Sequence, residues 1–246
     1  MNNSSQLALN VRLNINSTFE NFFCADLEAN KIGLKALKQN QEKFIYLLGS
    51  SGSGVSHLLQ AVCNDSNYKG ERSVYIPLSE VSKEDPETVF DGMDQFDCVC
   101  LDDLDAVIHR DNWQLEIFNL FNSIKLHDNR LVIGSHKNIT NFNLTFLDLE
   151  SRLKSFLSIG LTSLDDSQLI GFFSHQAKLK GMRISHGVAE FILNRVERNT
   201  HEMISILNIL DEQSLEKTKM ITIPFVKVAL NCLLYTSDAA DEASSV

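Results

Sequence analysis

One glycine-rich segment limits the possible folds of this chain more than any other feature: residues 49–56, which read Gly-Ser-Ser-Gly-Ser-Gly-Val-Ser. The apolar run Phe44–Leu48 precedes it, and apolar residues at helical spacing follow it. A glycine-rich turn between a buried strand and a helix is the setting of the phosphate-binding P-loop, G-x-x-x-x-G-K-S/T, whose backbone N–H groups surround the phosphates. The alternative is a glycine-rich turn without a ligand. The candidate nucleotide contacts here are Gly49, Ser50, Ser51, Gly52, Ser53, Gly54, Val55 and Ser56.

The lysine position of this loop is occupied by Val55. In a working P-loop the lysine ammonium balances charge on the β- and γ-phosphates, and a valine side chain cannot do so. We therefore expect ATP turnover by this chain to be badly impaired. ADP can still bind through the backbone donors, because these do not depend on side-chain identity. Whether the loop binds nucleotide or is vestigial stays open at this point.

A second motif is the apolar run Cys98–Leu101, which ends in Asp102 and Asp103. An apolar strand followed by acids, further along the chain than a P-loop, is the Walker B pattern of nucleotide hydrolases. Asp102 would hold Mg²⁺ together with the hydroxyl of Ser56, and Asp103 would polarise the attacking water. The alternative is a solvated loop at a strand end.

Short apolar runs alternate with segments of helical spacing as far as residue 164. This alternation predicts an α/β domain with a parallel five-stranded sheet and helices on both faces. The strands are expected at 44–48, 74–78, 98–101, 131–133 and 156–161, and the helices at 57–64, 87–95, 113–127 and 147–154.

After Leu164 the strand pattern stops, and Asp165 and Asp166 provide side chains that cap helices. A small all-helical domain is predicted, with helices near 166–180, 186–198, 201–216 and 224–230. The predicted organisation is a flexible leader (1–16), an α/β subdomain (17–164), a helical lid (165–231) and a tail (232–246) that is polar, lacks apolar periodicity and is expected to be non-native.

The amino-acid composition argues against some classes of function. The net charge of −10, from 32 acidic and 22 basic residues, opposes a broad grip on duplex DNA, because that grip depends on neutralising phosphates. Weak or no direct DNA binding is expected.

The five cysteines form no metal-binding spacing and are expected to be reduced thiols. No signal peptide or membrane-spanning run occurs in the sequence, so a soluble, cytoplasmic protein is expected.

Several segments together resemble the DnaA-related AAA+ family, the nucleotide-binding module of the bacterial replication initiator. Within that family the chain is most similar to the short Hda-type regulators, which inactivate the initiator. The segments that carry the resemblance are Thr18–Phe22, Gly49–Leu59, Asp91–Met93, Val99–Asp103, Leu149–Leu153 and Ile221–Leu230. The resemblance implies an AAA+ P-loop fold followed by a helical lid, and ADP as a ligand.

The resemblance also assigns a role to Arg152, which matches the arginine finger of the family. In AAA+ assemblies this arginine reaches the γ-phosphate of a neighbouring subunit and stabilises charge in the transition state. The alternative is a surface arginine paired with Glu150 or Asp148. A homo-oligomer of this chain stays open as well.

Three positions depart from the family pattern in the chain's own phosphate contacts. Val55 replaces lysine, His136 stands where the family usually has an aspartate, and His201 occupies the position of the sensor-2 arginine. A neutral imidazole contacts phosphate weakly compared with a guanidinium. Because Arg152 is retained while these groups are altered, the pattern favours a protein that completes the active site of another.

The leader contains Gln6, Leu7, Leu9 and Val11, which resemble the clamp-binding peptide Q-L-x-L of the family. Such a peptide lies extended in an apolar groove of the DNA sliding clamp. The resemblance therefore implies a negative regulator of replication initiation that is tethered to the clamp and stimulates ATP hydrolysis by DnaA. An active ATPase of the same fold, such as an initiator or helicase loader, and a nucleotide-free interaction domain remain the alternatives.

Overall fold

The computed structural model of the chain describes residues 13–214 and 220–230, and these form two compact units that divide after Ser163. The predicted clamp-binding residues Gln6, Leu7, Leu9 and Val11 and the tail from residue 232 lie outside the described residues.

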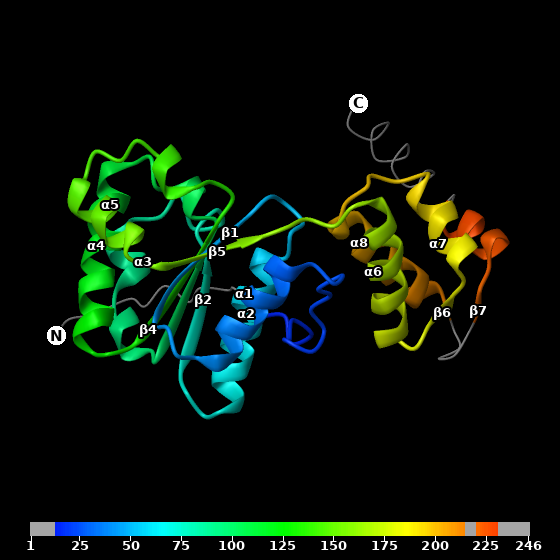
Figure 1. The fold of residues 1–246 in the computed structure, drawn as a ribbon, viewed down its shortest axis with the longest axis horizontal. Coiled ribbons are helices and arrows are strands. Elements are labelled where there is room, and N and C mark those ends of the chain that lie inside the picture. Colours follow the sequence, from blue (N-terminus) through cyan, green and yellow to red (C-terminus); the bar gives the residue numbers. More distant parts are fainter. Residues whose placement is uncertain (1–12, 215–219, 231–246) are drawn as a thin grey trace, which may run out of the picture. The chain divides into compact units, whose positions relative to one another are not determined.

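The first unit is built on a parallel sheet of five strands, as predicted (Figure 1). The strands follow the order β2-β3-β4-β1-β5, so that β4 lies between the strands carrying the two nucleotide motifs. Their bounds are β1 Phe44–Gly49, β2 Ser73–Pro77, β3 Cys98–Asp102, β4 Arg130–Ser135 and β5 Leu157–Leu161.

Helices cover both faces of this sheet, because successive residues of a strand point to opposite sides and the central strands are buried on both sides. On β3, Val99 and Leu101 join one apolar cluster, while Cys98 and Cys100 join the other. The first cluster packs against α3 (Pro86–Phe90), α4 (Asp111–Leu126) and α5 (Leu147–Lys154). The second packs against α1 (Glu28–Gln39) and α2 (Val55–Tyr68).

Two helices differ from the prediction. The helix α1 was not predicted, although its sequence is amphipathic, with Leu34 and Leu37 packed on the second apolar cluster and its lysines exposed. The helix predicted at 87–95 is interrupted, since α3 ends at Phe90 and Gly92 adopts a φ of 70°, in the left-handed region. A short 3₁₀ helix, η1 (Met93–Gln95), follows it. Two further 3₁₀ helices are η2 (Leu104–Ala106) and η3 (Ile139–Asn141).

The second unit is a helical lid, as predicted. Its helices are α6 (Asp166–Leu179), α7 (His186–Leu193), α8 (Thr200–Gln213) and a last helix at 223–230. The side chain of Asp165 caps α6 in a reciprocal arrangement with Gln168. The helix predicted at 186–198 ends at Leu193, because the chain must turn before Asn199 caps α8. This unit also contains two short strands, β6 (Arg183–Ile184) and β7 (Met220–Ile221), which pair in parallel.

No helix in the described part of the chain is long and apolar enough to span a membrane.

Candidate functional site

The glycine-rich segment forms the turn between β1 and α2, in the place where the sequence predicts a phosphate loop. Gly52 and Gly54 have φ angles of 78° and 95°, which side chains rarely tolerate. The amide of Ser53 donates to the carbonyl of Ser50 at 3.0 Å, and the amide of Leu58 donates to the carbonyl of Gly54 at 3.0 Å. The turn therefore depends on glycine and leads directly into the first turn of α2.

The inside of the turn suits an anion. A Cβ atom on Gly49 would lie 2.2 Å from the hydroxyl oxygen of Ser53, so the loop closes tightly over this glycine. The hydroxyl of Ser53 is buried and has no hydrogen-bond partner within the described residues. An unsatisfied buried hydroxyl costs about 1–3 kcal/mol, and a phosphate oxygen would satisfy it. The residues present therefore fit a phosphate group.

Val55 is 3% exposed and belongs to the apolar cluster between the sheet and α2. One of its methyl groups lies 2.6 Å from the position that a Cβ on Gly134 would take, so the side chain packs against β4. The loop therefore offers backbone amides and hydroxyls, and residue 55 contributes no cation.

Asp102 lies buried at the end of β3 and is held by several donors. Its carboxylate accepts a hydrogen bond from the hydroxyl of Tyr75 at 2.7 Å and one from the amide of Asp103 at 3.0 Å. Burial raises the pKa of this carboxyl, and a hydrogen bond with the Ser56 hydroxyl partly offsets that effect. The structure thus brings together Ser56 and Asp102, the two residues that would hold Mg²⁺. The contribution of Tyr75 was not predicted from the sequence.

Asp103 adopts a left-handed backbone with φ 55°, and its carboxylate accepts a hydrogen bond from Ser79 at 2.5 Å. The ring of His136 contacts both nucleotide motifs: Nε2 lies 3.5 Å from Oδ1 of Asp103, and Nδ1 lies 2.8 Å from the carbonyl oxygen of Gly49. The sequence indicated a replacement at position 136, but it gave no sign of this double contact.

The segment Thr18–Phe22 lies against α2. His57 Nε2 lies 2.8 Å from the carbonyl oxygen of Thr18, and Asn64 donates to the carbonyl of Ser17 at 2.8 Å. The Phe22 ring tilts against His57 with 5.7 Å between centroids and would lie 2.6 Å from a Cβ on Gly54. This N-terminal motif therefore packs directly on the glycine-rich loop. His57 and Asn64, which hold it, were not singled out from the sequence.

Burial lowers the pKa of His57 below its ordinary value of 6.5, and the hydrogen bond with Thr18 partly opposes that shift. The unfolded chain therefore binds this proton more readily than the folded chain, so stability falls as the pH drops through about 6.5. When the pH is lowered from about 7.5 to about 5.5, we expect the melting temperature of His57→Gln to fall less than that of the parent in thermal unfolding. His127→Gln, at an exposed histidine, should lose as much as the parent. Equal losses for His57→Gln and the parent would contradict this.

Arg152 lies exposed on α5, with its guanidinium 5.7 Å from the centre of the Phe121 ring. Glu150, which the sequence offered as a partner, instead pairs with Lys154 at 2.6 Å. No ion pair of Arg152 occurs within the part of the chain that the structure describes. The Phe121 ring supports the guanidinium without neutralising its charge.

His201 lies exposed in the first turn of α8, in the second unit. Its role in binding phosphate stays a prediction.

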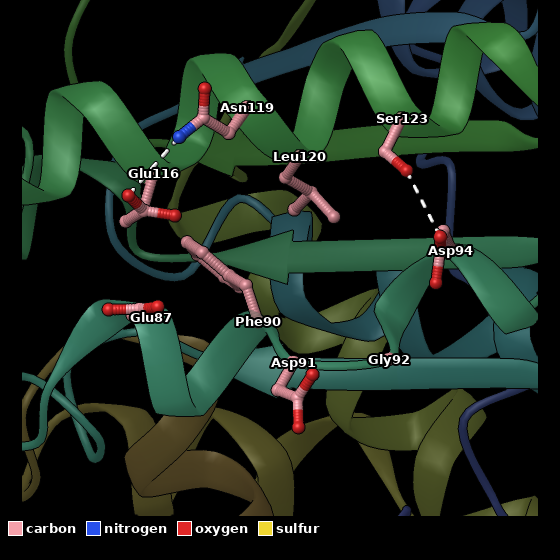
Figure 2. A pocket seen from close by; sticks show the side chains of 9 residues that line it. All are labelled: Glu87, Phe90, Asp91, Gly92, Asp94, Glu116, Asn119, Leu120 and Ser123. Carbon is pink, nitrogen blue, oxygen red and sulfur yellow. Dashed lines mark hydrogen bonds between the residues drawn. The ribbon is translucent and has the colours of Figure 1, made fainter.

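A separate hollow of about 240 Å³ lies between α3, η1 and α4 (Figure 2). Its acidic side chains are Glu87, Asp91, Asp94 and Glu116, and none of its lining residues is basic. Asn119 donates to Glu116 at 3.2 Å, and Ser123 donates to Asp94 at 3.1 Å. Four carboxylates repel phosphate, so this hollow does not compete with the glycine-rich loop as the nucleotide site.

Comparison with known proteins agrees with the fold. Residues 13–164 match the family of the bacterial DnaA ATPase domain, and residues 165–230 match the Hda lid domain. An uncharacterised protein of Haemophilus influenzae is 35% identical over 233 residues, which cover 93% of this chain and 99% of that protein.

Two solved structures have the same fold at low identity. Domain III of the replication initiation protein DnaA from Thermotoga maritima matches with a TM-score of 0.72 and 21% identity, over 90% of this chain and 98% of that one. AMPPCP-bound DnaA from Aquifex aeolicus matches with a TM-score of 0.68 and 21% identity, over 84% of this chain and 68% of that one. Because the two family models together match residues 13–230, the chain belongs to the DnaA-related, Hda-like family of AAA+ proteins.

Proposed function

We propose that this protein is a negative regulator of replication initiation, which stimulates ATP hydrolysis by a DnaA-type initiator while tethered to the DNA sliding clamp. It supplies Arg152 in trans to the γ-phosphate of the ATP held by the initiator. Its own site holds ADP or stays empty, and carries out little or no hydrolysis.

The observation that carries this proposal is the setting of Arg152. Its guanidinium is exposed, has the Phe121 ring beneath it and makes no ion pair within the described residues. A guanidinium that acts on another subunit must be accessible and must not be neutralised by its own chain. The neighbouring pair of Glu150 and Lys154 leaves Arg152 available for such a contact.

The chain's own phosphate site supports the second half of the proposal. Val55 is buried against β4, and the loop has no lysine at this position to balance charge on a triphosphate. Backbone amides of the loop and the orphan hydroxyl of Ser53 would hold the phosphates of ADP. Ser56 and Asp102 would hold Mg²⁺, which supplies charge neutralisation at the phosphates when bound.

The clamp tether rests on the sequence of the leader. We expect that Gln6→Ala combined with Leu9→Ala lowers retention on immobilised sliding clamp by at least about tenfold, because two anchor positions of an extended peptide are lost. A pull-down with purified clamp measures this, with Asn2→Ala and Asn3→Ala together as a control in the same leader. Unchanged retention of the Gln6 and Leu9 variant would remove the tether from the proposal.

The direct test measures hydrolysis of ATP bound to a DnaA-type initiator, with clamp loaded on DNA and this protein added. We expect the rate to rise when all three components are present and to stay at its basal value when this protein is omitted. An unchanged rate would refute the proposal.

The runner-up is an active ATPase of the same fold, which the contact between Ser56 and Asp102 favours. It predicts steady-state ATP turnover by the isolated protein.

A further inference from the structure

We propose that Tyr75 is a positioning residue for the metal ion of this site, because its hydroxyl holds the Asp102 carboxylate in the direction in which Asp102 and Ser56 share Mg²⁺. The inference rests on the proposed binding of a nucleotide with Mg²⁺ at the glycine-rich loop. It concerns only this chain, so its tests need neither the initiator nor the clamp.

The Asp102 carboxylate depends on hydrogen-bond donors from its surroundings. Asp102 is 2% exposed, and a buried carboxylate is costly unless hydrogen bonds replace the water that it has lost. The Tyr75 hydroxyl donates to Oδ2 at 2.7 Å, and the Asp103 amide donates to Oδ1 at 3.0 Å. Tyr75 is therefore the side chain that fixes the Oδ2 end of the carboxylate.

The Tyr75 side chain is itself held in place. The pairing of β2 with β3 sets Tyr75 opposite Cys100, two residues before Asp102, and its ring packs against the second apolar cluster. Gln60 of α2 also bonds to the Tyr75 hydroxyl. Because the Oε1 atom of Gln60 accepts from the amide of Asn14 at 3.2 Å, its NH₂ group is the donor to the tyrosine oxygen. The hydroxyl is thus fixed between α2 and the end of β3.

A donor in this position acts on metal binding through the carboxylate. An ionised carboxylate only accepts hydrogen bonds, and burial together with the Asp102 charge raises the pKa of Tyr75, so the phenol keeps its proton and donates. Mg²⁺ requires near-ideal octahedral geometry, so the direction of a carboxylate that holds it is critical. Groups that hydrogen-bond to metal-binding side chains typically contribute about 10–100-fold to metal affinity.

The first experiment titrates ADP into the full-length protein by isothermal titration calorimetry, once with saturating Mg²⁺ and once with EDTA. We expect Tyr75→Phe to bind ADP at least about tenfold more weakly than the parent with Mg²⁺, and equally well with EDTA. Tyr46→Phe is the matched control, because Tyr46 is a buried tyrosine of β1 whose hydroxyl donates to the Lys137 carbonyl at 2.7 Å. It should bind ADP like the parent in both conditions.

Two results of this titration would overturn the proposal. Equal affinity of Tyr75→Phe and the parent with Mg²⁺ would show that the hydroxyl does not position the metal site. An equal loss with Mg²⁺ and with EDTA would show that Tyr75 only supports the fold around the loop.

A second measurement tests whether Tyr75 acts through Asp102. In the Asp102→Asn background, Tyr75→Phe should cost no further affinity for ADP in the presence of Mg²⁺, because the two losses share one cause. A further loss of about tenfold in that background would overturn the proposal.

These results separate the inference from the proposed function. A parent that bound ADP no better with Mg²⁺ than with EDTA would remove the metal ion from the proposed function and overturn the role of Tyr75 as well. A normal response to Mg²⁺ in both the parent and Tyr75→Phe would overturn the role of Tyr75 alone. Failure of the trans-acting Arg152 would change neither titration.

Discussion

Replacing Arg152 by alanine is expected to abolish nearly all stimulation of initiator ATP hydrolysis, with a loss of at least about 100-fold and up to the 10³–10⁵ typical of arginine fingers. The physical reason is that charge on the transferring phosphoryl group loses its stabilising guanidinium in the transition state. Single-turnover hydrolysis of ATP bound to the initiator, with loaded clamp and excess regulator, measures the effect.

Two variants at this surface make the result specific. Lys154 lies on the same helix, and its exposed charge is already paired with Glu150. Lys154→Ala should therefore stimulate ATP hydrolysis by the initiator to within about twofold of the parent. Arg152→Lys keeps the charge but loses the planar fork of donors, and should recover only a small part of the rate. If Arg152→Ala stimulated as well as Lys154→Ala, the arginine would have no role in the chemistry.

The second large effect is expected at Gly54. Alanine there must adopt a φ of 95°, and its Cβ would lie 2.6 Å from the ring of Phe22. Strain of about 1–2 kcal/mol adds to this collision, so the loop must change shape and lose its aligned amides. We expect affinity for ADP to fall by at least about tenfold in isothermal titration calorimetry.

Gly70 provides the matched control. It has a φ of 82°, and no atom lies within 4 Å of the position that its Cβ would take. Gly70→Ala therefore carries similar backbone strain without a collision and away from the loop, so it should lower stability and leave ADP affinity unchanged. If Gly54→Ala bound ADP like the parent, the loop would not be the phosphate site. If the parent itself bound no ADP, the loop would be vestigial.

The sheet and the nucleotide motifs could be predicted because each depends on local sequence. Strand-length apolar runs such as Phe44–Leu48 and Cys98–Leu101 must be buried, and glycines 52 and 54 occupy a turn that requires positive φ. The helix α1 also carries a local signal, since Leu34 and Leu37 recur at helical spacing among lysines, and the prediction missed it. What the sequence does not contain is the close approach of α1 to β5 at Gly33, where a Cβ would lie 2.9 Å from Ile159.

The contacts that distinguish this site were also beyond prediction, because they join residues far apart in the chain. Nothing near His136 in the sequence indicates that its ring reaches Gly49 and Asp103. Tyr75 reaches Asp102 because β2 and β3 are adjacent, with Tyr75 opposite Cys100. His57 meets Thr18 only once the N-terminal motif lies against α2. In each case the tertiary register decides the contact.

The most direct measurement follows which bound ATP is cleaved. Radiolabelled ATP is loaded on the initiator in one reaction and offered to this protein alone in another, and the release of labelled phosphate is followed in both. We predict rapid release from the initiator once loaded clamp and this protein are added, and almost none from this protein alone. Release from this protein alone at a comparable rate, with no acceleration on the initiator, would contradict the proposal that Arg152 acts in trans.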